Sequence, residues 1–215
     1  MIRTADELLD RIASELVWRR RELTDLRALV QQSDGTLRSR VIIRASVALL
    51  YAHWEGFVKK TASYYVDFVA SQRLPYRRLK SNFLALALRA RFESLGCSNK
   101  LSAANDLAEF FSTKMDSVAS FSHKNSIDTK SNLSSKVLLD IITVLGISKE
   151  PFETRFNFID SNLVNPRNHI AHGEVISISV KEYLELHDGV LALIESFRNE
   201  IENSSVLKVF DRNSV

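Results

Sequence analysis

Apolar residues recur at every seventh position near the start of the chain, at Leu9, Leu16, Leu23 and Val30. This spacing places the four side chains on one face of an α-helix of about seven turns. Thr4 followed by Glu7 is typical of a capping box that begins such a helix, and Ser-Asp-Gly at 33–35 ends it. A helix with one long apolar face needs a partner to cover that face, which limits the fold to those that pair long helices.

A second long periodic segment runs from Thr36 to the Leu74-Pro75 pair, and the short break before it predicts antiparallel pairing with the first helix. Only six glycines and three prolines occur in 215 residues, which disfavours the many tight turns of a sandwich or barrel. Shorter helices are expected near 81–95 and 101–118. A third is expected near 136–145, capped by Ser134 or Ser135 and ended by Gly146, and a fourth near 180–201, begun by a capping box of Ser179 and Glu182. We therefore expect an all-α helical bundle with long antiparallel helices, in a single domain spanning residues 1–215.

Two stretches lack this periodicity. Residues 117–135 are mostly polar, which predicts a mobile loop, and residues 204–215 are expected to form a frayed tail. The apolar runs are shorter than the roughly 18 to 20 residues of a membrane span, and the N-terminus is charged rather than apolar. With Cys97 as its single cysteine, the chain is expected to be a cytoplasmic protein without a membrane partner.

The charge is distributed unevenly along the chain. Residues 1–100 carry 18 Lys and Arg against 10 Asp and Glu, whereas residues 101–215 carry 11 against 16. The stretch between Asp67 and Glu93 has no acidic residue, and a basic run of this kind is typical of binding to a phosphate-rich partner. The candidate RNA contacts in it are Arg73, Arg77, Arg78 and Lys80. A solvated helix surface explains the same run equally well.

The segment NLVNPRNHIAHGEV at 162–175 holds two of the five histidines. If 157–172 is helical, one face turns to the protein's own core and contains Ile159, Leu163, Pro166 and Ile170. Arg167, Asn168 and His172 then lie on the opposite face and point away from that core. Proline at 166 either kinks this helix or begins a new one in its first turn. By itself, the pattern also fits a solvated polar helix end.

Two blocks of this sequence resemble the HEPN superfamily, whose active members are helical ribonucleases. RNHIAHGE resembles the superfamily signature of Arg followed by Asn, Asp or His and then, after a spacer, by His. LLYAHWEGFVKKTASYYVDFV at 49–69 is similar to the long second helix of one bacterial branch, the MAE-type HEPN-like nucleases. The proline directly before Arg167 departs from the pattern. The resemblance covers most of the chain and implies a HEPN-like bundle.

The resemblance implies metal-independent RNA cleavage that needs no cofactor, in a homodimer whose two motif helices face one another. Arg167 and His172 would be catalytic: His172 would move protons, and Arg167 would bind the scissile phosphate. The 2′-hydroxyl would attack, leaving 2′,3′-cyclic phosphate and 5′-hydroxyl ends. The biology implied is a bacterial toxin–antitoxin or defence effector, with an antitoxin or defence protein as a further partner.

Three further residues are candidates for supporting roles. Asn168 is expected to orient the phosphate or the imidazole. His169 either touches substrate or packs at the flank of the helix, and its spacing to His172 does not match the i, i+4 histidines of a zinc protease helix. Glu55 would be costly to bury unpaired, and Arg167 is one candidate partner for it. The aromatic residues around Glu55, including Tyr51, are expected to be core.

Two other classes of function fit the same residues. A binding module would use the Arg face for RNA or nucleotides without cleavage, or would act as a regulatory partner. A purely structural helical adaptor would have no affinity for RNA.

Overall fold

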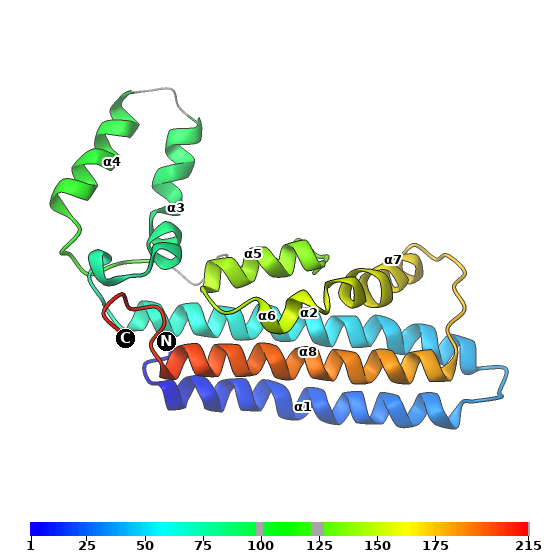
Figure 1. Cartoon of the computed structure of the whole chain (residues 1–215). Helices are drawn as coiled ribbons and strands as arrows, with labels where there is room; N and C mark the ends of the chain where they lie inside the picture. Colours follow the sequence, from blue (N-terminus) through cyan, green and yellow to red (C-terminus); the bar gives the residue numbers. More distant parts are fainter. Residues whose placement is uncertain (98–100, 122–126, 215) are drawn as a thin grey trace.

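Three long helices lie side by side and form the body of the molecule (Figure 1). The computed structural model describes residues 1–97, 101–121 and 127–214. The three helices are α1 (Ala5–Gln32), α2 (Ser39–Ser71) and α8 (Val180–Val206). α2 packs against both of the others, and α1 and α2 run antiparallel, as their short connection predicts.

Local sequence explains where α1 and α8 begin. Thr4 Oγ1 accepts a hydrogen bond from the Glu7 amide at 3.1 Å and so caps α1. Ser179 and Glu182 form a complete capping box at the start of α8, as predicted. The apolar face of α1 is buried in the bundle at Leu8, Ile12, Leu16, Leu23, Leu26 and Val30.

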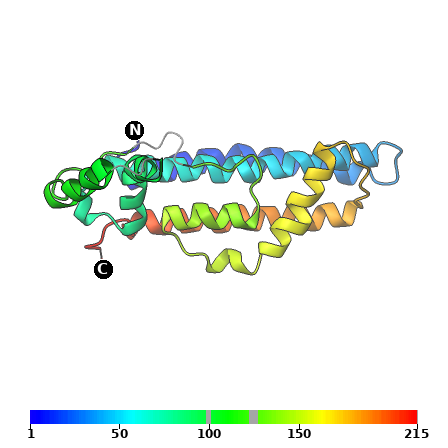
Figure 2. The same ribbon diagram turned by 90° about the horizontal axis from the view of Figure 1, so that it is seen from above.

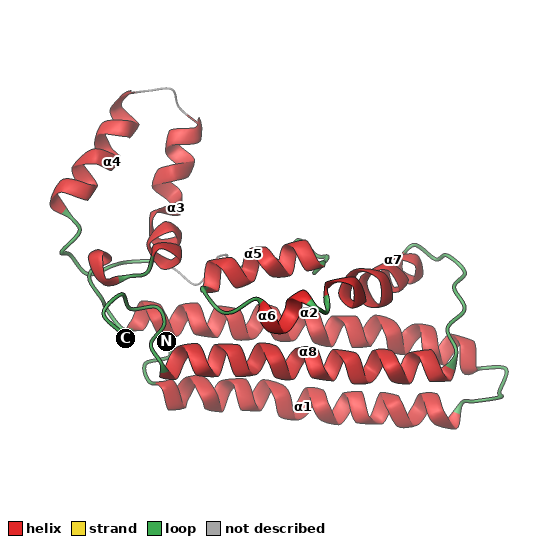
Figure 3. Cartoon of the chain, viewed as in Figure 1, coloured by secondary structure: helices red, strands yellow, loops and turns green. Residues whose placement is uncertain are grey.

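The shorter helices fall into two groups. After the 3-10 turn η1 (Tyr76–Arg78), α3 (Ser81–Cys97) and α4 (Leu101–Thr113) form an arm that projects from one end of the bundle (Figure 3). The second group lies over α2 and α8, as the view from above shows (Figure 2). It consists of α5 (Ser135–Leu145), α6 (Glu150–Glu153), the π-helix η2 (Phe158–Val164) and α7 (Asn165–Ala171).

The predicted fold class, an all-α bundle with long antiparallel helices, is confirmed. Within the described ranges the chain forms helices and no β-strand, with only isolated bridges such as Pro75 to Val118. Ser134 caps α5, and Gly146 ends it in the left-handed conformation at φ +66°, as predicted. α4 is shorter than expected because the segment after it pairs with the chain after α2, where the Ala119 amide donates to the Leu74 carbonyl at 2.8 Å.

The C-terminal segment packs onto the bundle, and the predicted frayed tail at 204–215 is wrong for the residues described there. Phe210 is 2% exposed and contacts the rings of Tyr65 and Phe68. The next residue, Asp211, is buried and forms an ion pair with Arg78. One buried aromatic side chain and one ion pair to a buried carboxylate therefore hold the segment against α2 and η1.

The predicted mobile loop at 117–135 also differs from the structure where its residues are described. Ile127, Thr129 and Leu133 are buried, and the Leu133 amide donates to the Tyr51 hydroxyl at 2.6 Å. A few apolar residues are enough to hold this segment in place, because they pack on the surface of α2. Residues 122–126 lie outside the described part of the chain, so the prediction is not tested there.

α2 is long and apolar enough to cross a membrane by length and composition, a property that the search for continuous apolar runs missed. It is the one helix with this property among the described residues. In this fold α2 packs against α1, α5, α7 and α8, so much of its apolar surface lies in the core. Such a central core helix passes the same compositional test.

Candidate active site

The motif segment is a π-helix followed directly by an α-helix. η2 ends where α7 begins, and Pro166 lies in the first turn of α7, which is the second of the two predicted possibilities. Gly173, at φ +75°, ends the helix just after His172. Ile159 and Leu163 are fully buried, whereas Pro166 and Ile170 on the same predicted face are half-buried.

Arg167 lies against α2 rather than pointing away from its own chain, which differs from the predicted orientation. Its guanidinium carbon is 4.3 Å from the centre of the Tyr51 ring. Nη2 donates to the Ser131 carbonyl at 3.0 Å, and Nη1 donates to Asn168 Oδ1 at 2.9 Å. The segment before α5 covers this side of α7, a contact that the sequence did not predict. Bonds to the described residues use two of the five guanidinium N–H donors, which leaves three that these residues do not occupy.

Tyr51 is buried, as predicted, and it also supports Arg167. The pKa of Tyr51 is raised to about 12, because burial and the nearby carboxylate of Glu55 raise it more than the Leu133 amide and Arg167 lower it. Tyr51 is therefore a neutral phenol at physiological pH. Glu55 and Arg167 both act on Tyr51, but they do not form an ion pair with each other in the described part of the chain. The i, i+4 spacing of Tyr51 and Glu55 was the signal in the sequence that could have identified this support.

His172 is exposed at the C-terminal end of α7. Its ring forms no hydrogen bond with the described residues, so both ring nitrogens are available. His169, on the same helix, is 43% exposed and its Nδ1 contacts the Glu174 carboxylate. This contact and the charge of His169 hold the pKa of Glu174 below its ordinary value. Arg44 of α2 donates to the Glu174 carbonyl at 2.6 Å, which ties the end of α7 to α2.

The predicted RNA contacts in the basic run lie elsewhere. α2 continues for twenty residues beyond Tyr51 before the run begins, a distance of about 30 Å along the helix. Arg77 is paired with Asp116, and Arg78 is paired with the buried Asp211. Arg73 is exposed and Lys80 half-buried. The structure therefore brings Arg167, Asn168, His172 and Glu55 into one region around α7, and leaves the basic run outside it.

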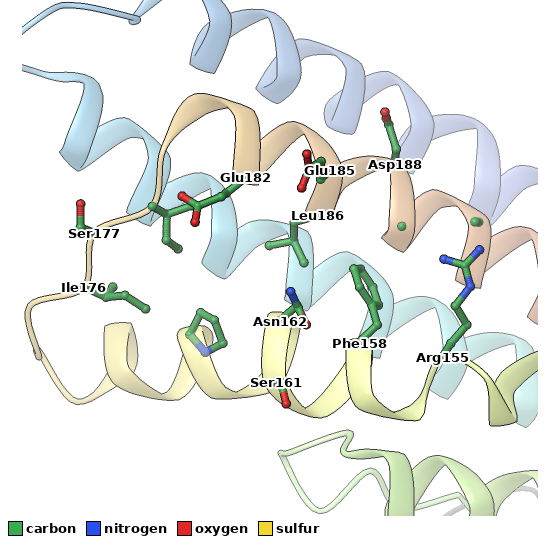
Figure 4. A pocket seen from close by; sticks show the side chains of 14 residues that line it. Arg155, Phe158, Ser161, Asn162, Ile176, Ser177, Glu182, Glu185, Leu186 and Asp188 are labelled. Atoms are coloured by element: carbon green, nitrogen blue, oxygen red, sulfur yellow. The ribbon is translucent and has the colours of Figure 1, made fainter.

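A cavity of about 620 Å³ lies on another side of the motif segment, between η2 and α8 (Figure 4). Phe158 and Leu186 point toward each other across it, and Glu185 and Asp188 line it from α8. Phe158 also packs so closely on Gly189 that a Cβ atom there would lie 2.3 Å from the ring. Pro166 lines this cavity, but none of the predicted site residues does.

His169, His172 and Glu174, three side chains of metal-ligand type, lie close together in the sequence. Among the residues that the structure describes, no three His, Cys, Asp or Glu side chains gather closely enough to hold a metal ion. His169 contacts the Glu174 carboxylate, and no third such side chain joins them among the described residues.

Comparison with known proteins matches most of the chain to a protein family. The model of a family described as RiboL-PSP-HEPN matches residues 14–203. That range contains all of α2, α7 and the segment between them. No curated protein and no solved structure matches the chain.

Proposed function

This chain belongs to the RiboL-PSP-HEPN family, and from that premise we propose that it is a metal-independent endoribonuclease. The match confirms the resemblance to the HEPN superfamily that RNHIAHGE suggested, but the MAE-type branch is not confirmed. Membership of the family supports a role connected with RNA. The chemistry proposed below rests on the residues of α7.

The observation that carries the proposal is the presence of Arg167 near the start of one short helix and of His172 at its end. Arg167 is held in place by a tyrosine ring, a carbonyl and an amide oxygen, none of which carries a formal negative charge. Its charge and three of its N–H donors therefore remain for an anion. His172 lies five residues further on, about 1.4 helical turns, and is exposed to solvent. A phosphate binder beside a titratable imidazole is the minimum that RNA transesterification requires.

In the proposed reaction, the 2′-oxygen of the ribose attacks the adjacent phosphorus, and the bond from phosphorus to the 5′-oxygen breaks. One imidazole takes the proton of the 2′-hydroxyl, and a second donates a proton to the departing 5′-oxygen. Arg167 stabilises the additional negative charge of the pentacoordinate transition state, and Asn168 holds the guanidinium in position. The products carry a 2′,3′-cyclic phosphate and a 5′-hydroxyl, and DNA is inert because it lacks the attacking group.

A second copy of the chain would supply the second imidazole. His172 is the one exposed histidine beside Arg167 that is not already paired with a carboxylate in the described residues. A two-fold axis near α7 would bring two such histidines and two arginines to one cleft. Mixing His172→Ala subunits with Arg167→Ala subunits tests this, because a shared cleft makes the mixture's activity differ from the sum of the two variants.

The biological role we propose is that of a bacterial toxin–antitoxin or defence effector acting on cytoplasmic RNA, with a partner protein that restrains it. Growth arrest on expression of the wild type, but not of His172→Ala, would agree with this role. Equal growth of both strains with equal protein levels would contradict it.

A non-catalytic RNA-binding module is the second candidate, and the contacts of Arg167 favour it in one respect. The Tyr51 ring and the Ser131 carbonyl would fix an arginine that only binds a phosphate as well as one that catalyses. The two candidates differ in the need for His172, since binding without cleavage requires no proton transfer.

The deciding experiment is cleavage of an end-labelled single-stranded RNA in EDTA by the wild type and by His172→Ala. Arg89→Ala is the matched control, because Arg89 is exposed and pairs with Glu93 on α3. We expect cleavage by the wild type and the control, cyclic phosphate at the new ends, and about 10²–10⁴-fold less cleavage by His172→Ala. Binding of RNA by a folded, dimeric wild type that does not cut it would favour the binding module.

A further inference from the structure

A pocket of about 410 Å³ lies between the first half of α1 and the second half of α2. Three basic side chains line it: Arg11 from α1, and Lys59 and Lys60 from α2. All three residues are exposed. Tyr64 lines the same pocket, and the Arg11 guanidinium carbon lies 5.9 Å from the centre of its ring.

The three positive charges are not neutralised by ion pairs with the described residues. The nearby carboxylates have other partners. Asp67 accepts a hydrogen bond from the Ile2 amide at 2.7 Å. Glu15 accepts one from Arg19 at 2.6 Å and one from the Tyr64 hydroxyl at 3.0 Å. The pocket therefore presents a net positive surface, in contrast to Arg77 and Arg78 of the basic run, which are both paired with carboxylates.

The position of the pocket relates it to the site on α7. Lys59 follows Tyr51, which supports Arg167, by eight residues of the same helix. Eight residues rise about 12 Å and turn about 80° around the axis, so Lys59 lies further along α2 on a neighbouring face. A stacked strand advances about 3.4 Å per nucleotide, so about three or four nucleotides cover the rise alone. Lys60, nine residues after Tyr51, is turned about 180° around the axis of α2, so the strand needs further nucleotides to cross α2 and reach it. Glu55 lies between them, half-buried and directed to Tyr51.

We propose that Arg11, Lys59 and Lys60 bind backbone phosphates of the same RNA strand whose scissile phosphate lies at Arg167. This proposal rests on the proposed function and assigns the path of the substrate along α2. The three side chains are positioning residues, because they contact phosphates several nucleotides from the cut and take no part in proton transfer. Contacts of this kind add affinity that is independent of base sequence and falls with salt.

The test measures binding of a 12-nucleotide single-stranded RNA in a His172→Ala background, where cleavage does not interfere. Lys59→Gln/Lys60→Gln is compared with Lys149→Gln/Lys181→Gln, which removes the same charge from lysines already paired with Glu153 and Glu185. We expect about tenfold weaker binding for the first pair at low salt, and a salt dependence of log K that is shallower by about 1.4. The second pair should bind like the parent.

Kinetics with the catalytically intact protein provide a separate readout. Lys59→Gln/Lys60→Gln should raise KM about tenfold and leave kcat unchanged. A dinucleotide, too short to reach the pocket, should show no difference between variant and wild type. Equal affinity of the two double variants, or an unchanged salt slope, would overturn the assignment while leaving cleavage at Arg167 and His172 intact. Absence of RNA binding by the parent at any salt would also overturn it, and the cleavage assay would then decide the proposed function by itself.

Discussion

Arg167 and Arg78 both contact segments that are distant in the sequence, but Arg167 has neutral partners and Arg78 has a carboxylate. Arg167 lies over the first half of α2, held by the Tyr51 ring and two neutral oxygens. Arg78 follows the end of α2 and donates to both carboxylate oxygens of Asp211, a hydrogen bond that raises the pKa of Arg78. The charge of Arg167 is thus available to a phosphate, and that of Arg78 is used to fold the chain. The partner of an arginine, rather than the density of charge around it, decides whether it can bind a ligand.

The comparison first predicts that the end of the bundle around Arg78 is structural. Phe210→Ala should lower the free energy of unfolding by about 3–5 kcal/mol, because it removes a fully buried ring from contact with Tyr65 and Phe68. Urea unfolding followed by circular dichroism measures the loss as a lower midpoint. Leu207→Ala, in the same segment but 64% exposed, is the control and should change stability by less than about 0.5 kcal/mol. Equal, small effects of both substitutions would show that the segment is frayed after all.

The second prediction concerns the available charge of Arg167. Arg167→Ala should reduce kcat for RNA about 10²–10³-fold, the usual loss when a donor to a developing oxyanion is removed. Arg167→Lys should restore only part of it, because an ammonium cannot bind a phosphate bidentately. Cleavage kinetics and an unfolding curve are measured on the same preparations. Wild-type kcat in a folded Arg167→Ala protein would remove Arg167 from the reaction.

The third prediction concerns the pH dependence of the Arg78 contact. Burial raises the pKa of Asp211, but the hydrogen bonds from Arg78 and the Asn213 amide outweigh burial and lower it. Arg78→Ala should therefore lower the urea midpoint of unfolding at pH 7, since it leaves the Asp211 carboxylate without its main partner. Because the folded pKa is depressed, this stabilisation is present above the unfolded pKa of about 3.9 and is lost as the pH falls through the folded value.

Unfolding at several pH values tests that sign. The loss of stability caused by Arg78→Ala should become smaller below about pH 4, because a protonated Asp211 no longer requires a cation. Arg77→Ala is the control: its partner Asp116 is 74% exposed, so it should cost less than about 1 kcal/mol. If Arg78→Ala lowered stability equally at pH 7 and pH 3, Arg78 would stabilise the protein by packing rather than by charge.

Features encoded by neighbouring residues could be predicted from the sequence. The start of α8 follows from Ser179 and Glu182, and the end of α5 follows from Gly146, since each requires residues within one turn. The predictions that were wrong concern contacts between segments that are distant in the sequence. Nothing near Phe210 indicates the space that Tyr65 and Phe68 leave for it, and nothing near Arg167 indicates the Ser131 carbonyl. The burial of Tyr51 was predictable from its helical position, whereas its contact with Arg167 was not.

The smallest expected effect separates the two histidines of α7. The His169 ring already contacts the exposed carboxylate of Glu174, while the ring of His172 has no such contact in the described chain. His169→Ala removes only this exposed contact, so it should change kcat/KM by no more than about fivefold. His172→Ala should reduce it by about 10²–10⁴-fold, since it removes a proton carrier. Glu174→Gln serves as the matched control, because it breaks the same contact from the other side and should reproduce the effect of His169→Ala. If His169→Ala lost as much activity as His172→Ala while Glu174→Gln lost none, His169 would contact the substrate directly, and its contact with Glu174 would be displaced when RNA binds.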